Sequence, residues 1–208
     1  MIIKRTIPKA LIADMPRATF QGRIEVVQSL PEMERALRYL SEQPLVGIDT
    51  ESRPSFKKGL LHDVALLQVS TADICFLFRL NIIGMPEALV RFLENPSVLK
   101  IGLSLKDDVS ALHRRTDFDS QSLVELQRYV KQFGIEDTGL QRIYAILFGE
   151  KISKSQRLSN WEADVLSDAQ KLYAATDAWA CYKIYTLLEM LKQTSNYEIE
   201  EINETEEA

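Results

Sequence analysis

A carboxylate interrupts the apolar face of a helix-forming stretch in the last quarter of the chain, KLYAATDAWACYKIY. Tyr173 and Asp177 are four residues apart, so on a helix their Cβ atoms lie about 5–6 Å from each other. Steps of three and four beyond Asp177 reach only apolar positions: Cys181, Ile184, Leu188 and Leu191. Burial of an ionised carboxylate is costly unless a positive group meets it. The pair therefore predicts either a hydrogen-bonded contact in the core or part of a cation site.

Two further carboxylates end a β-rich run, LVGIDTES. Strand alternation places Asp49 and Glu51 on one face, and two residues of strand rise about 6.6 Å, so the two carboxylates can converge. They lie at the C-terminal end of the strand, where α/β sheets usually carry sites. Taken alone, this short motif is more typical of a solvated strand end.

The stretch IGLSLKDDVSAL contains adjacent acids at the start of an expected helix. Leu105, Asp108 and Leu112 fall on one helical face, whereas Asp107 points toward solvent, where the helix dipole favours it. Asp108 is therefore the expected inward acid. In isolation, both residues are more typical of an ordinary helix N-terminus.

Four acids that each face inward would repel one another strongly if they met without cations. Two Mg²⁺ or Mn²⁺ ions would neutralise them, and two ions about 3.5–4 Å apart can flank a phosphate and activate a water molecule for in-line attack. Mg²⁺ prefers carboxylate oxygens and retains water ligands, and no Cys/His ligand cluster competes in this sequence. The residues therefore predict a two-ion site formed by Asp49, Glu51, Asp108 and Asp177.

The elements that must position these acids are read from hydrophobic periodicity. Strands are predicted at 22–29, 45–52, 64–70, 74–80 and 98–104, and the third and fourth form a hairpin. Helices are predicted at 31–43, 86–93, 106–115, 123–132, 138–148 and 167–192, the last opening with a capping box at Ser167 and Gln170. Antiparallel strands followed by alternating strands and helices predict an α/β fold, a mixed sheet flanked by helices.

Composition predicts one compact domain with two distinct ends. The chain has 208 residues, 46% of them hydrophobic and 26% charged, and a formal net charge of −5. Six of the 30 acidic residues lie beyond residue 194, which leaves 24 against 25 Lys and Arg in the remainder. We therefore expect an N-terminal extension over 1–21, a domain over 22–194 and an acidic, disordered tail over 195–208. The acidic average does not exclude a nucleic-acid partner.

The cysteines and apolar runs predict a reducing, cytoplasmic location. Cys75 and Cys181 both lie among apolar residues and do not suggest a disulfide framework. His62 and His113 are far from either cysteine in sequence, so a zinc site is not expected. No apolar run reaches the ~20 residues of a membrane span, and the first residues lack the apolar core of a secretory signal.

The motifs IDTE, GLSLKDD and YAATD, in this order, resemble those of the DEDD 3′–5′ exonucleases, whose fold is ribonuclease H-like. The Tyr-x-x-x-Asp spacing resembles their tyrosine branch, since the histidine branch would place His at Leu172. The stretch LSNWEADVLSDAQKLYAATDAWACYKIY is especially similar to exonuclease domains of the Werner type, and the resemblance covers residues 22–192. Ser52 departs from that type, which often carries an aromatic residue there.

The resemblance implies a role for each site residue. It makes Asp49 the bridging ligand of both ions, and it makes Glu51 and Asp177 ligands of the ion that activates the attacking water. Asp108 would hold the second ion through water, and Tyr173 would position the nucleophilic water with its hydroxyl. It also implies a metal-dependent 3′–5′ exonuclease, active in DNA repair, that acts on a free DNA 3′ end and releases nucleoside 5′-monophosphates. No helicase or accessory helical segment fits in the remaining length, so we expect a stand-alone nuclease.

Basic side chains on two loops are the expected contacts with the phosphate backbone. They follow the first motif (Arg53, Lys57 and Lys58) and precede the SNW triplet (Lys151, Lys154 and Arg157). Trp161 is predicted either to stack on a base or to pin its loop to the core, and Ser159 and Asn160 to organise that loop.

Two other functions stay open at this point. An RNA 3′-end-trimming exonuclease would use the same residues, because the fold serves both polymers. A module that binds nucleic acid or a protein partner without cutting is the alternative from another class. The complete acidic set counts against pure binding, because a binder gains nothing from carboxylates that repel one another.

Overall fold

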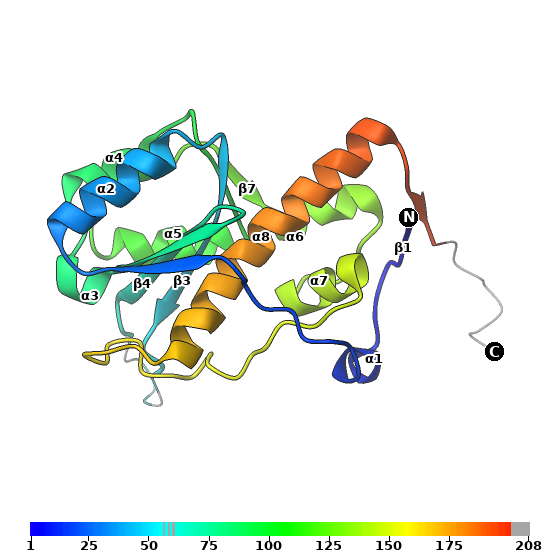
Figure 1. Ribbon diagram of the computed structural model, residues 1–208, viewed down its shortest axis with the longest axis horizontal. Helices are drawn as coiled ribbons and strands as arrows, with labels where there is room; N and C mark the ends of the chain where they lie inside the picture. The colour runs from blue at the N-terminus through cyan, green and yellow to red at the C-terminus, as the bar shows by residue number, and fades with distance from the viewer. Residues whose placement is uncertain (56, 58, 60, 201–208) are drawn as a thin grey trace.

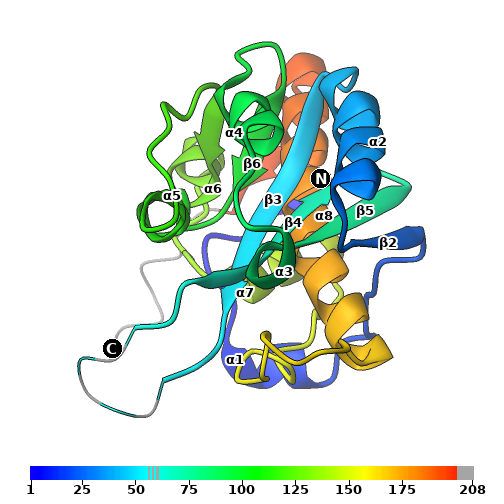
Figure 2. The same cartoon turned by 90° about the vertical axis from the view of Figure 1, so that its left-hand side faces the viewer.

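A single six-stranded mixed sheet forms the centre of the protein (Figures 1 and 2). The computed structural model describes residues 1–55, 57, 59 and 61–200. The strands lie in the order β2-β5-β4-β3-β6-β7. Their bounds are β2 (Arg23–Val27), β3 (Leu45–Ser52), β4 (Val64–Ser70), β5 (Ile74–Arg79), β6 (Leu99–Gly102) and β7 (Leu123–Glu125). β4 runs antiparallel to both of its neighbours, and the other pairs are parallel.

Helices cover both faces of this sheet. Side chains of α2 (Leu30–Ser41), α4 (Glu87–Glu94) and α5 (Leu105–His113) share a core with Val46, Ile48 and Leu67 on one face. The long α8 (Asp168–Thr194) crosses the other face and packs beside α7 (Leu140–Phe148). The short elements are α1 (Lys9–Ala13), α3 (Leu80–Ile83), α6 (Leu126–Tyr129) and the 3₁₀ helix η1 (Val130–Phe133). The predicted mixed sheet flanked by helices is confirmed.

The element predictions hold for the centre of the chain and fail at one place. The five predicted strands and the antiparallel hairpin of β4 and β5 are confirmed. The helix predicted over 123–132 is wrong in its first residues, because Leu123–Glu125 pair with Lys100–Gly102 as the edge strand β7. Among the described residues, none of the helices combines the length and the apolarity that crossing a membrane requires.

Both ends of the chain differ from their predicted description. Ile3, Ile7 and Ile12 are buried in a core shared with α7 and α8, so the predicted extension is packed onto the domain. β1 (Ile2–Ile3) pairs in parallel with β8 (Glu198–Ile199), so part of the predicted disordered tail forms a strand. Residues 201–208 lie outside the described part of the chain.

The capping box predicted at the start of α8 is present. The Ser167 side chain accepts the backbone N–H of Gln170, and the Gln170 side chain accepts the backbone N–H of Ser167.

Helix α8 approaches strand β3 unusually closely. Farther along, a Cβ atom on Gly47 would lie 1.9 Å from the carbonyl oxygen of Ala178. Glycine at position 47 is what allows the two backbones to touch. The contact fixes Asp177, the preceding residue, beside the strand.

Candidate active site

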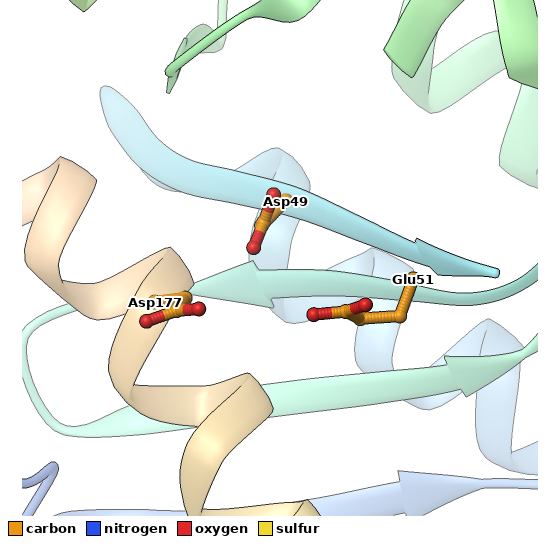
Figure 3. Close-up of side chains that lie close together, drawn as sticks. All are labelled: Asp49, Glu51 and Asp177. Atoms are coloured by element: carbon orange, nitrogen blue, oxygen red, sulfur yellow. The ribbon is translucent and has the colours of Figure 1, made fainter. Parts of the chain in front are cut away.

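Three carboxylates from β3 and α8 meet at one point. One ligand oxygen each from Asp49, Glu51 and Asp177 can be chosen so that all lie within 4.8 Å of one another. Figure 3 shows Asp49 and Glu51 projecting from one side of β3 toward Asp177 on α8. Strand alternation accounts for the first two acids and the Gly47 contact for the third.

Asp108 joins the same cleft from α5 but is held slightly apart. The hydroxyl of Thr50 donates a hydrogen bond of 2.5 Å to its carboxylate, and Asp108 lines the cleft together with the other three acids. Leu105 and Leu112 are buried on the same helical face, while Asp107 is exposed. The structure therefore brings all four predicted acids together and turns Asp107 away from them.

Burial raises the pKa of each of the four acids, and repulsion by the other acids of the cluster raises it further at Asp49 and Glu51. Burial, followed by the charges of the other three acids, holds the pKa of Asp49 well above its usual range. Burial and the charges of Asp177 and Asp108 raise the pKa of Glu51 to about 9. Burial also raises the pKa of Asp177 to about 7 and that of Asp108 to about 6. The cleft therefore concentrates more negative charge than it can hold ionised at neutral pH without cations.

The chemistry of the donor set fits hard divalent cations. The clustered donors are carboxylate oxygens, which Mg²⁺ and Mn²⁺ prefer. The thiol of Cys181 also lines the cleft, but burial and the nearby acids raise its pKa well above the usual value, so it is not a thiolate ligand. Gln68 lies directly opposite Asp49 in β4, is fully buried, and its amide has no partner among the described residues. Gln68 does not line the cleft, so the fit to cations rests on the carboxylates.

Tyr173 lies one helical turn before Asp177, and its hydroxyl is near enough to that carboxylate to lower the carboxylate's pKa. Burial and the surrounding acids raise the pKa of its phenol beyond the ordinary value, so the hydroxyl stays neutral and can donate. Its ring packs against the indole of Trp161, with the centroids 6.0 Å apart. The arrangement makes Tyr173 a fixed hydroxyl at the edge of the acidic cluster.

Trp161 supports this tyrosine from within the core. Its side chain is fully buried, so the prediction that it stacks on a base is wrong and the alternative, a packing role, is confirmed. The predicted organising role of its neighbours is visible in the loop: the Asn160 side chain accepts the backbone N–H of Glu162, and Ser159 donates to Gln156. Asn160 therefore shapes the loop with its side chain.

The predicted basic contacts divide between the cleft and its surroundings. Lys154 and Arg157 line the cleft of 320 Å³ that contains the four acids. Arg53 is paired with Glu162 at 3.4 Å, and neither it nor Lys57 lines that cleft. Lys151 donates to the carbonyl of Ala13. Lys58 lies outside the described residues.

Glu125 contributes to the site although no sequence pattern identifies it. Its carboxylate accepts the backbone N–H groups of Ser104 at 3.0 Å and Leu105 at 2.7 Å, and that of Gln127 at 3.0 Å. Ser104 has left-handed backbone geometry, with φ at 65°. The carboxylate thus fixes the turn from which α5 carries Asp108 into the cleft.

The orientation of α5 predicts unequal effects of replacing its adjacent acids. We expect Asp108→Asn to reduce turnover by at least about 10²-fold, because a charged group that faces the reacting centre is removed. Asp107→Asn removes the same charge from an exposed position and should change turnover less than about twofold. Steady-state kinetics on one substrate compares the two variants; equal losses, or the reverse order, would contradict the assigned orientation.

The raised pKa values predict that the metal-free protein loses stability as the pH rises. Asp and Glu titrate near pH 4 when unfolded, so between about pH 4 and 9 the folded chain binds more protons than the unfolded chain. The free energy of unfolding must then fall as the pH rises through this window. We expect, in EDTA, a melting temperature several degrees lower at about pH 8.5 than at about pH 5.5.

Divalent ions should reverse this loss, since they bind the folded state only. Millimolar Mg²⁺ or Mn²⁺ should raise the melting temperature more at the higher pH, where the acids are ionised. The melting temperature of protein stripped of divalent ions with EDTA is the reference value at each pH. A melting temperature indifferent to both pH and divalent ions would mean that the four acids do not share a site.

Comparisons with known proteins extend over nearly the whole domain. A family described as 3′-5′ exonuclease matches residues 24–192. The mouse bifunctional 3′-5′ exonuclease/ATP-dependent helicase WRN is 34% identical over 174 residues, which is 81% of this chain and 12% of that protein. An Arabidopsis thaliana 3′-5′ exonuclease is 29% identical over 86% of this chain and 67% of its own length. Ribonuclease D of Gluconacetobacter diazotrophicus is 26% identical over 78% of this chain and 42% of its own length.

Solved structures share the fold. The Aedes aegypti Nibbler EXO domain superposes with a TM-score of 0.77 at 22% identity, covering 87% of this chain and 95% of that one. Escherichia coli RNase D superposes with a TM-score of 0.74 at 20% identity, covering 83% of this chain and 46% of that one. These matches confirm the predicted ribonuclease H-like fold.

Proposed function

Because this chain belongs to the 3′–5′ exonuclease family, we propose that it hydrolyses phosphodiester bonds from the 3′ end of DNA with two Mg²⁺ or Mn²⁺ ions. The products would be nucleoside 5′-monophosphates. The observation that carries this proposal is the convergence of Asp49, Glu51, Asp108 and Asp177 beside the hydroxyl of Tyr173. Repelling carboxylates cost folding free energy, and a surface that only binds nucleic acid has no use for them.

The acids divide by position into ligands for two cations. The charges of all three other acids raise the pKa of Asp49, so we assign Asp49 as a ligand of both ions. Glu51 and Asp177 would hold one ion with it, and Asp108, from the α5 side, the other. When bound, such ions supply an activated water molecule and neutralise charge on the reacting phosphate.

The remaining cleft residues orient the reactants. The neutral hydroxyl of Tyr173 can hold the attacking water in place, but its raised pKa makes it a poor base. The side chains of Lys154 and Arg157 lower the pKa of Asp177 and Glu51 respectively, so their positive charges act at the acidic cluster. The same charges would attract the phosphate of the terminal nucleotide.

DNA is the substrate that we favour, because the stretch from Leu158 to Tyr185 resembles the Werner-type domains and the mouse relative has the higher identity. RNA trimming is the second candidate, supported by the ribonuclease D relative at 26% identity. The cytoplasmic location and the role in DNA repair stay predictions of the sequence.

The test uses matched single-stranded DNA and RNA oligonucleotides that carry a label at either end. With Mg²⁺ or Mn²⁺, a 5′-labelled DNA should shorten one nucleotide at a time, while a 3′-labelled one should release labelled mononucleotide at once. EDTA should abolish both reactions. Asp49→Asn protein, purified by the same procedure, controls for contaminating nucleases. Faster degradation of RNA would replace the DNA assignment, and internal cleavage or no cleavage would contradict the proposal.

A further inference from the structure

An N-terminal segment, residues 16–20, lies against the wall of the acidic cleft, although it precedes the family match at 24–192. The backbone N–H of Ala18 donates to the carbonyl of Lys151 at 2.9 Å, and that of Lys151 donates to the carbonyl of Pro16 at 2.9 Å. These bonds form a parallel bridge between Arg17 and Lys151. The segment is therefore paired with Lys151, and the three residues that follow Lys151 (Ile152, Ser153 and Lys154) line the cleft.

A second anchor ties the segment to α8 next to a candidate metal ligand. The backbone N–H of Phe20 donates to the hydroxyl of Thr176 at 3.1 Å, and Thr176 directly precedes Asp177. The ring of Phe20 is buried and packs against Trp179, with the centroids 6.1 Å apart. In Figure 1 this part of the chain crosses α8 between α1 and β2. Its backbone is thus fixed at both ends.

Successive side chains of the segment alternate between the core and the surface. Ala18 and Phe20 are buried, whereas Arg17 is exposed and Thr19 is partly exposed. Arg17 and Thr19 line a small recess together with Ser153 and Tyr173. Ser153 and Tyr173 also line the acidic cleft, so the recess and the cleft are neighbours that share a wall.

The guanidinium of Arg17 has no ion pair or hydrogen bond among the described residues, unlike Arg53, which is paired with Glu162. A cationic fork on a fixed backbone suits a bidentate contact with a phosphate, because the planar guanidinium presents its donors in a fixed geometry. The positive charges of Lys154 and Arg157 lie at the acidic cluster, where the negative charges of the acids partly compensate them. Arg17 lacks such compensation.

We propose that Arg17 binds a backbone phosphate of the nucleic-acid strand on the Tyr173 side of the cleft. The inference rests on the proposed function and assigns the N-terminal segment to the substrate site. Arg17 would hold the strand in register without touching the reacting atoms. Its loss should then weaken substrate binding and leave the turnover of bound substrate unchanged.

The test measures binding of a fluorescent single-stranded DNA in an Asp49→Asn background with Mg²⁺, where no cleavage interferes. One phosphate contact contributes about 0.7 to the slope of log K against log salt for a single strand. Arg17→Ala should reduce that slope by about this amount and weaken binding roughly three- to tenfold at moderate salt. Arg17→Lys should restore the slope. Arg35→Ala, which removes an exposed arginine from α2 on the other face of the sheet, is the matched control and should match the parent.

The same substitution in the active enzyme should raise KM and leave kcat within about twofold. An Arg17→Ala slope and affinity equal to those of the parent, in protein with an unchanged melting temperature, would overturn the inference while leaving the exonuclease assignment intact. If Arg17→Ala reduces the slope in the Asp49→Asn background but the protein with Asp49 intact cleaves no nucleic acid, the phosphate contact would be supported and the proposed function contradicted instead.

Discussion

Asp49→Ala and Asp49→Asn should each reduce exonuclease activity by at least about 10³-fold while the protein stays folded. Groups that act as one unit at a reacting centre lose most of their effect when one member is removed. Asp49 is the acid whose pKa is raised by all three of the other acids, so it lies at the centre of the cluster. Initial rates on a 5′-labelled oligonucleotide, at saturating Mg²⁺, give the comparison.

A second measurement on these variants separates a catalytic loss from unfolding. Removal of one repelling carboxylate should stabilise the metal-free protein, so its melting temperature in EDTA should rise at about pH 8.5. The stabilising effect of Mg²⁺ should shrink at the same time. Wild-type turnover in either variant would show that the assigned cation site is wrong, whereas inactivity with a lowered melting temperature would show only damage to the fold.

Tyr173→Phe should reduce turnover by about 10²–10⁴-fold, the usual cost of losing a group that orients or transfers a proton. The substitution deletes the hydroxyl next to Asp177 but keeps the ring that packs on Trp161, with the centroids 6.0 Å apart. KM should change little, because the basic residues and the carboxylate site remain. Full time courses at several substrate concentrations resolve kcat from KM.

Tyr185→Phe is the matched control for that change. Tyr185 lies on the same helix and packs against Tyr129, with the ring centroids 5.1 Å apart, so it loses an equivalent oxygen away from the acids. Its turnover should stay within about twofold of wild type. If Tyr173→Phe instead cuts normally but melts several degrees lower, Tyr173 is a packing residue and another group must hold the water.

Local periodicity predicted the direction of each acid but not its burial, because the motifs of Asp49, Glu51 and Asp108, taken alone, also fit a solvated strand end or an ordinary helix N-terminus. Asp49 and Glu51 break a strand pattern, and Asp108 and Asp177 break helical ones, so their inward direction follows from spacing alone. Their convergence required the sheet order, which places β3 between β4 and β6 beneath α8. The strand order depends on pairing between residues far apart in the sequence. Local patterns do not predict such pairing, so at the level of the sequence it followed only from the resemblance to a family of known fold.

Other parts of the site depend on contacts that leave no local pattern. Residues 123–132 have a helical composition, but the open edge of β6 pairs with Leu123–Glu125 and converts the start of the run into a strand. Glu125 becomes the anchor of α5 only through that strand. A tryptophan in a polar loop fits either a stacking or a packing role, and only the burial of Trp161 decides between them. Arg17 carries no periodic signal, and its position follows from one backbone bridge to Lys151.

The contact between Gly47 and Ala178 limits how this enzyme can be engineered for thermostability. Glycine is a poor strand former, and replacing it inside a strand is a usual route to a more rigid chain. At position 47 that route is closed, because a single added methyl group would meet a backbone carbonyl at 1.9 Å, which no side-chain rearrangement can relieve. The helix would have to move outward and carry Asp177 away from Asp49. Stabilising substitutions must therefore come from elsewhere, such as the exposed faces of α2 and α4 on the opposite side of the sheet, where the spacing of the four acids is not at stake.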